Sequence, residues 1–258
     1  MFNKNPLTSS QKLHTNPFDY IFSISSDDDK EIIDLLEYTL LGRVYCYGDH
    51  FKKSNTSKII FWIKNIALIS FIFLQNAYLY TNSVKKNSKK GISSSYYNAD
   101  RKFIEQGMQT LRPIWSPSKF QKSHLSFKIA ILYLKLSYRL TFYDFNKLLS
   151  VGSFKLIRQF EMVLKKDIIK QGFAFAITPE DCSFFSRLII KIFEDINKPT
   201  ILMAHGIPGA YGNDIDQRTD LITQWGSRQV QSFAANNYDT NRFRVTGHPL
   251  YNDFPNKF

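Results

Sequence analysis

The loop that follows the apolar run 200–204 combines a histidine with closely spaced glycines. It reads HGIPGAYG and contains His205, Gly206 and Gly209. Glycine lets a backbone approach a ligand closely, and histidine can contact a phosphate or exchange a proton near neutral pH. We therefore expect His205 to be catalytic, as a base or a phosphate contact, and Gly206 and Gly209 to bind substrate. A tight loop with a hydrogen-bonded histidine is the alternative, and the spacing matches neither common nucleotide-binding glycine pattern.

Two later segments have the same design. Gly226 follows the strand-like run 220–225, and Gly247 and His248 follow the run 243–246. A glycine or histidine directly after a strand suits a ligand-binding loop. We therefore expect Gly226, Gly247 and His248 to bind substrate, with plain turns as the alternative interpretation.

A carboxylate is the second catalytic candidate. Asp181 follows the apolar run 173–177, and its alternative role is to cap the helix that comes next. Asp214 and Asp216 form an Asp-x-Asp pair on a connecting segment, where we expect a solvated turn. The sequence therefore predicts no metal site and no cofactor.

These candidates need a scaffold that brings the ends of several strands together. The apolar runs 173–177, 200–204 and 243–246 alternate with helical patterns over 183–196 and 228–237. This alternation predicts an α/β fold whose parallel strands are covered by helices. In such sheets ligands bind beyond the carboxyl ends of the strands, which is where all the candidates lie.

The preceding part of the chain is predicted to be mainly helical. The acidic run 27–29 favours a helix start, and apolar residues continue at helical spacing to Leu41. The basic linker 82–90 marks a domain boundary. Beyond it the sequence predicts a short strand within 91–98 and helices over 98–111, 124–149 (broken near Thr141) and 153–170.

The segment 58–80 is unusually apolar. Lys64 and Asn65 interrupt it, and the uninterrupted part, 66–74, is less than half of the roughly 20 residues that span a bilayer. Lysines lie on both sides of the segment, which suits anionic headgroups as well as solvated helix ends. A buried core helix, a helix on a membrane surface and a spanning helix all fit this pattern.

The charge narrows the classes of partner. The chain of 258 residues has 34 Lys and Arg against 22 Asp and Glu, a net charge of +12. This favours nucleic acid, anionic lipid or phosphate-bearing substrates. No nucleic-acid motif is present, so we expect no nucleic-acid partner. Cys46 and Cys182 do not have the spacing of a metal site, and no signal peptide is visible, so we expect a cytoplasmic chain. The lysines beside the segment 58–80 lead us to expect a peripheral position at the inner face of the cell membrane.

The order of three motifs resembles a known enzyme class. PTILMAHG (199–206), DLITQWG (220–226) and VTGHPLYND (245–253) are similar to the interlobe region of GT-B glycosyltransferases. They are similar to the bacterial enzymes of surface polysaccharide, capsule and lipopolysaccharide biosynthesis. CDP-glycerol glycerophosphotransferases and UDP-N-acetylglucosamine 2-epimerases are relatives.

The resemblance implies two Rossmann-like lobes with a hinge within 199–258. We therefore expect a helical region at 1–90, an acceptor lobe at 91–218, and at 219–258 only the first βαβ unit of a nucleotide-binding lobe. On this basis the chain stops inside the second lobe and resembles a C-terminally truncated enzyme that is inactive alone.

The implied reaction is transfer of a sugar from a nucleotide-activated donor to a glycan or lipid-linked acceptor. The nucleotide sugar is then a substrate, and an anionic membrane surface is an additional partner. Two alternatives stay open at this point. One is a glycerophosphotransferase- or epimerase-like enzyme on the same fold, and the other is a non-catalytic, basic, membrane-associated binding protein.

Overall fold

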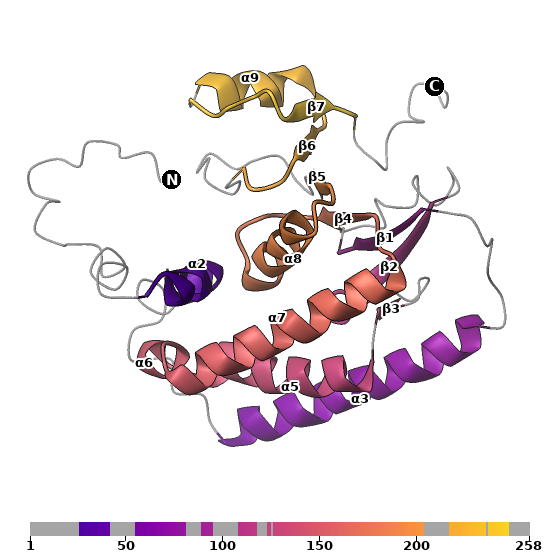
Figure 1. The fold of residues 1–258 in the computed structure, drawn as a ribbon, viewed down its shortest axis with the longest axis vertical. Coiled ribbons are helices and arrows are strands. Elements are labelled where there is room, and N and C mark those ends of the chain that lie inside the picture. Colours follow the sequence, from indigo (N-terminus) through magenta and orange to yellow (C-terminus); the bar gives the residue numbers. More distant parts are fainter. Residues whose placement is uncertain are drawn as a thin grey trace, which may run out of the picture.

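One parallel sheet organises the chain. The computed structural model describes residues 26–41, 55–80, 89–94, 108–117, 123–124, 126–203, 217–235 and 237–247. Within them, seven strands form a sheet in the order β3-β2-β1-β4-β5-β6-β7, and every neighbouring pair is parallel (Figure 1). The strands are β1 (Lys90–Ser93), β2 (Gln109–Pro113), β3 (Ser123–His124), β4 (Phe175–Thr178), β5 (Thr200–Met203), β6 (Leu221–Gln224) and β7 (Phe243–Val245).

Helices connect and cover these strands. They are α2 (Asp27–Leu41), α3 (Asn55–Tyr80), α5 (Phe127–Phe142), α6 (Phe145–Leu148), α7 (Val151–Gln171), α8 (Phe184–Asp195) and α9 (Ser227–Ala235). Figure 1 shows α7, α5 and α3 running side by side, with α3 outermost. The α/β class with a parallel sheet, predicted from the sequence, is confirmed.

The ends of the helices follow from their local sequence. The Ser126 and Ser150 side chains accept the backbone N–H groups of Ile129 and Ser153, which caps α5 and α7. At its other end α7 stops at Gly172, whose φ of 69° lies in the left-handed region that suits glycine. These signals explain why the helices predicted over 124–149 and 153–170 are confirmed within a few residues.

One predicted helix ends differently. The helix predicted over 98–111 does not extend to Leu111, because Gln109–Pro113 is strand β2, paired with β1 and β3. The earlier part of that prediction, 98–107, lies outside the described residues. A strand that is buried on both faces does not alternate between polar and apolar residues. The sequence of β2 therefore contained no strand pattern that would have argued against a helix.

The two strands assigned to a second lobe belong to the first sheet. Ile201 of β5 pairs with Leu221 of β6, and Ile222 of β6 pairs with Phe243 of β7. The Asp220 carboxylate also accepts hydrogen bonds from the Thr200 backbone N–H and Oγ1, at 2.8 and 2.9 Å. As far as it is described, the segment 219–258 therefore extends the sheet of 91–218 and forms no separate one.

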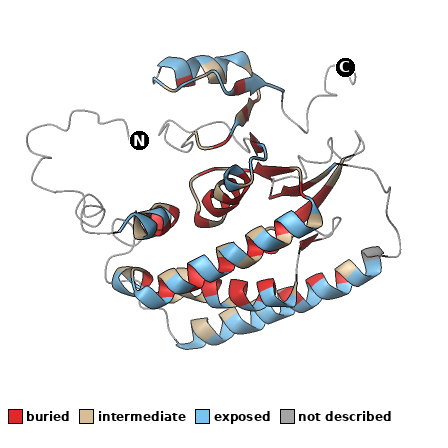
Figure 2. Ribbon diagram, in the orientation of Figure 1, coloured by how far each residue is buried: buried red, intermediate tan, exposed pale blue. Residues whose placement is uncertain are grey.

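The expected boundary at residue 90 does not divide the hydrophobic core either. Ile33 and Leu36 of α2 and Ile72 of α3 belong to the same buried cluster as Phe160 of α7 and Phe193 of α8. A smaller cluster, made of Leu202, Ile222, Phe233 and Phe243, fills the space between α9 and the last strands. Figure 2 shows buried residues along the strands and along the inner faces of the helices, whereas much of α3 is exposed.

Candidate functional site

The strand order creates one ligand-binding position by topology alone. From β1 the chain moves to β2 on one side, and from β4 it moves to β5 on the other, although β1 and β4 are neighbours. Parallel sheets bind ligands at this reversal, beyond the carboxyl ends of the strands. Residues that follow β1, β4, β5, β6 and β7 are therefore candidates for ligand contact.

Small hydroxyl side chains end β1 and β4. Ser94 donates from its backbone N–H and from Oγ to the Ile177 carbonyl, at 3.0 and 3.3 Å. Ser116, after β2, donates from Oγ to the Ser94 carbonyl at 3.3 Å. Opposite them Thr178 is buried, and its Oγ1 has no hydrogen-bond partner in the structure. The reversal point is therefore lined by polar groups, among which the Thr178 hydroxyl has no hydrogen-bond partner among the described residues.

The start of α8, directly after β4, is already filled by a carboxylate of the chain itself. Glu180 accepts the backbone N–H groups of Cys182 and Ser183 at 2.9 and 2.7 Å, and the hydroxyl groups of Ser183 and Ser186 at 2.5 and 2.6 Å. Burial alone would raise the pKa of the Glu180 carboxyl, but these hydrogen bonds outweigh it and hold that pKa below its ordinary value. A substrate phosphate would have to displace this anion from the helix start.

Asp181 has a different contact from the one expected of a helix cap. It is fully buried, and its Oδ2 accepts the backbone N–H of Arg218 at 3.1 Å, just before β6. The Arg218 guanidinium in turn donates to both oxygens of Asp34 in α2, at 2.7 and 2.8 Å. In this structure Asp181 therefore positions the chain that returns to β6, and its catalytic role stays a prediction.

A buried glutamine ends β6. Gln224 is 0% exposed, and neither Oε1 nor Nε2 of its amide has a hydrogen-bond partner among the described residues. It lies on the same face of the strand as Ile222, which packs against α9. Its backbone carbonyl accepts the N–H of Thr246 at 2.9 Å, so the ends of β6 and β7 are adjacent.

The turn from β6 into α9 differs from the turn into α8. The Trp225 backbone N–H donates to Oε1 of Gln229 at 2.7 Å, and the first turn of α9 contains no acidic residue. Gly226 has open space where a Cβ would stand, so crowding does not require a glycine there. Gly247, after β7, has φ of 75° and does need the freedom of glycine.

The remaining predicted site residues lie outside the described residues. These are His205, Gly206, Gly209 and His248, and also Asp214 and Asp216. Strand β5 ends at Met203, and its neighbours in the sheet are β4 and β6. Thr178 at the end of β4 and Gln224 at the end of β6 therefore lie on the two strands beside β5, and neither was predicted to be a site residue. A glutamine two residues after a buried isoleucine in a strand was the available signal.

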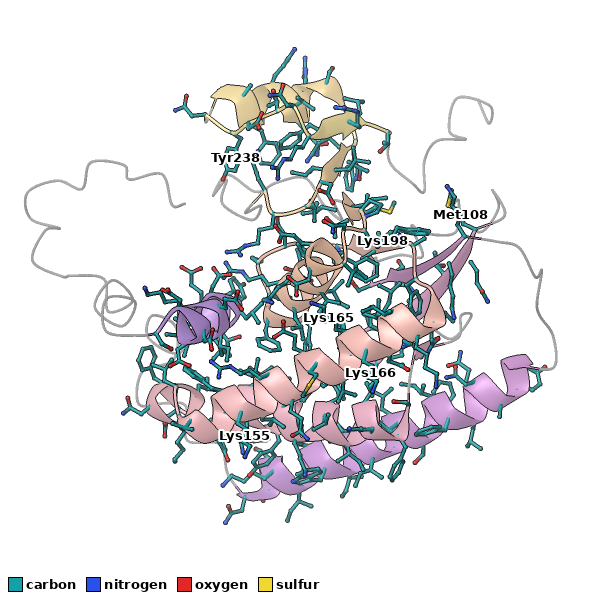
Figure 3. The ribbon with its side chains drawn as sticks, viewed as in Figure 1. Met108, Lys155, Lys165, Lys166, Lys198 and Tyr238 are labelled. Carbon is teal, nitrogen blue, oxygen red and sulfur yellow. The ribbon has the colours of Figure 1, made fainter. Side chains whose placement is uncertain are left out.

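Two other polar features involve helix α7. His124 Nε2 lies 2.6 Å from Asp167 Oδ2, and this hydrogen bond leads the causes that lower the pKa of Asp167. The histidine is buried, so the pair ties β3 to α7. A shallow hollow also runs along the outer face of α7, where Figure 3 labels Lys165 and Lys166, but all its lining residues belong to that one helix. Among the described residues no group of three or more potential ligands could hold a metal ion.

Comparison of the chain with models of protein families, with curated proteins and with solved structures gives no match.

Proposed function

We propose that this chain forms a substrate-binding lobe of a glycosyltransferase, which moves a sugar from a nucleotide-activated donor to a glycan or lipid-linked acceptor. The observation that carries the proposal is the strand order. It places the segments that follow β4, β5, β6 and β7 in one row beside the reversal point at β1 and β4. The motif resemblance to GT-B enzymes supplies the reaction class.

The residues at this edge fit the proposed roles to different degrees. His205, which follows β5, is the proposed base or phosphate contact. Gln224 and Thr178 supply buried polar atoms without partners, and a bound hydroxyl-rich ligand would provide the hydrogen bonds that they lack. Asp181 acts as a positioning residue through Arg218.

Ligand-induced stabilisation tests the proposal on the chain as it exists. Thermal unfolding would be followed with UDP-, GDP-, CDP- and dTDP-activated sugars and with CDP-glycerol. A ligand at about 100 times its Kd stabilises by about 2.7 kcal/mol, which raises Tm by about 5–10 °C for a domain of this size.

The outcomes separate the proposed reaction from its alternatives. We expect one sugar nucleotide to raise Tm, and the variant His205→Ala to reduce that rise while its Tm without ligand stays unchanged. Stabilisation by CDP-glycerol alone would favour a glycerophosphotransferase. Stabilisation by no donor at any concentration would contradict the proposal, and an unchanged Tm rise in His205→Ala would remove His205 from the binding site.

A further inference from the structure

The outer face of α3 is apolar and exposed. Ile59, Ile63, Ile66 and Leu74 are 60%, 63%, 53% and 72% exposed, and at helical spacing they follow one side of the helix. An exposed helix face normally carries charged residues, and a helix that is apolar all round is normally buried. Of the most apolar 18-residue window of this helix, only 6% is buried. This face therefore fits an apolar environment outside the chain.

The opposite face of α3 is fixed to the protein along its length. Phe61 packs edge-on against Phe142, near the end of α5, at 5.3 Å between ring centroids. Near the other end of α3, the Asn76 amide donates to the Ser123 carbonyl at 2.8 Å and accepts the Ser123 N–H at 2.9 Å. Because Ser123 precedes α5, the two helices are antiparallel. The exposed face of α3 is consequently held along the molecular surface.

The excess positive charge of the chain comes from the stretch of sequence that contains α3 and α5. Residues 50–143 carry 16 Lys and Arg but two Asp and Glu, a net charge of +14, whereas the whole chain has +12. Neither α3 nor α5 contains an acidic residue. Lys64 is exposed on α3, and Lys128, Lys135 and Phe127 are exposed on α5, the helix that packs against α3. An apolar strip with cations on its own helix and on the neighbouring helix matches a surface of anionic lipid.

We infer that α3 docks the protein onto an anionic lipid bilayer, with the helix axis parallel to the membrane and the face of Ile59, Ile63, Ile66 and Leu74 below the headgroups. The helix has 26 residues, about 39 Å long at 1.5 Å per residue. It is long enough to span, but its contacts at Phe61 and Asn76 hold it against α5 over that length. Trp62 and Tyr78 are exposed on the same helix, as suits the headgroup level. The docking stands independently of the reaction proposed above.

Vesicle sedimentation tests this inference. The vesicles would contain phosphatidylcholine alone or with about one third phosphatidylglycerol. We expect at least ~10-fold tighter binding to the anionic vesicles at about 0.1 M salt, and weaker binding at about 0.5 M salt. The variant Ile59→Ser/Ile63→Ser/Leu74→Ser should lose at least ~10-fold in binding to anionic vesicles because it removes the apolar strip.

A matched control uses exposed apolar residues elsewhere. Val151, Met162 and Ile169 of α7 are 83%, 63% and 57% exposed, and their triple change to Ser should leave vesicle binding unaltered. Equal loss in both variants, or no loss in the α3 variant, would overturn the assignment of this face. A dimer that only the α3 variant dissociates, without vesicle binding by the unmodified chain, would identify a second copy as the occupant and overturn it too. Resistance to alkaline carbonate extraction would show a spanning helix and overturn the parallel orientation.

Discussion

At the level of single residues, the two adjacent carboxylates after β4 accept hydrogen bonds from different parts of the chain. Glu180 fills the start of α8, while Asp181 accepts the Arg218 backbone N–H. Glu180→Gln removes the negative charge that faces the helix start and weakens the hydrogen bonds from Ser183 and Ser186. We expect a loss of about 1–2 kcal/mol in the free energy of unfolding, measured by denaturant titration. Glu194→Gln, an exposed change on the same helix, should cost less than about 0.5 kcal/mol.

The contribution of Glu180 should depend on pH with a defined sign. Its pKa is lower in the folded protein than the ordinary value of 4.5, so the unfolded chain binds a proton first as pH falls. The stabilisation is then fully present above pH 4.5 and is lost as pH falls through the folded pKa. Unfolding curves of the unmodified protein and of Glu180→Gln should converge on acidification. A difference that stays constant below that range would contradict the ionic role.

Gln224 offers a test in which stability and function move in opposite directions. Its buried amide has no partner in the structure, and such a group costs about 1–3 kcal/mol in desolvation. Gln224→Met keeps the shape and should raise the free energy of unfolding by about 1 kcal/mol. The same change should abolish the Tm shift caused by a bound donor. Gln229→Met is the control with the opposite sign, because Gln229 Oε1 accepts the Trp225 N–H.

Among the elements, β1 and β4 pack so closely at Gly91 that a side chain there would meet the Phe175 ring. A Cβ on Gly91 would lie 2.2 Å from the Phe175 ring, so Gly91→Ala overpacks the centre of the sheet. We expect a loss of about 3 kcal/mol in the free energy of unfolding. Phe175→Leu in the same chain should recover part of it, and a double-mutant cycle measures the coupling. Strictly additive effects would show that the ring is not the obstacle.

Elements with clear caps, helical periodicity or an isolated apolar run could be predicted from the sequence. Elements that depend on contacts with distant parts of the chain could not. The capped, periodic sequence of α7 and the runs around Phe175 and Thr200 gave the correct element types. Strand β2 lacked a pattern because it is buried between two partners. The joining of β6 to β5 depends on a contact across 20 residues, Asp220 with Thr200. Likewise the Gln224 amide could be recognised as a candidate site group only once its burial was known, because most glutamine side chains in folded proteins are exposed to solvent.

Across the whole molecule, buried charges join the first helix to the rest of the chain. Glu37 of α2 accepts a hydrogen bond from Arg187 of α8 at 2.9 Å, and both side chains are buried. The residues 1–90, expected to form a separate region, thus contribute through α2 to the core that supports β4. One consequence is that α2 and the sheet should unfold together.

Glu37→Gln tests this cooperation. It removes the nearest described carboxylate from the Arg187 guanidinium, while the Asp34 carboxylate lies 3.7 Å away, and breaking a buried pair costs several kcal/mol. We expect a loss of about 2–3 kcal/mol, with hydrogen exchange accelerated equally in peptides from α2 and from α8. Glu31→Gln, whose side chain is 65% exposed and 3.6 Å from Lys191, should change stability by less than about 0.5 kcal/mol. If exchange rose in α2 alone, that helix would be a separately folding attachment, and the sheet with its carboxyl edge would be stable without it.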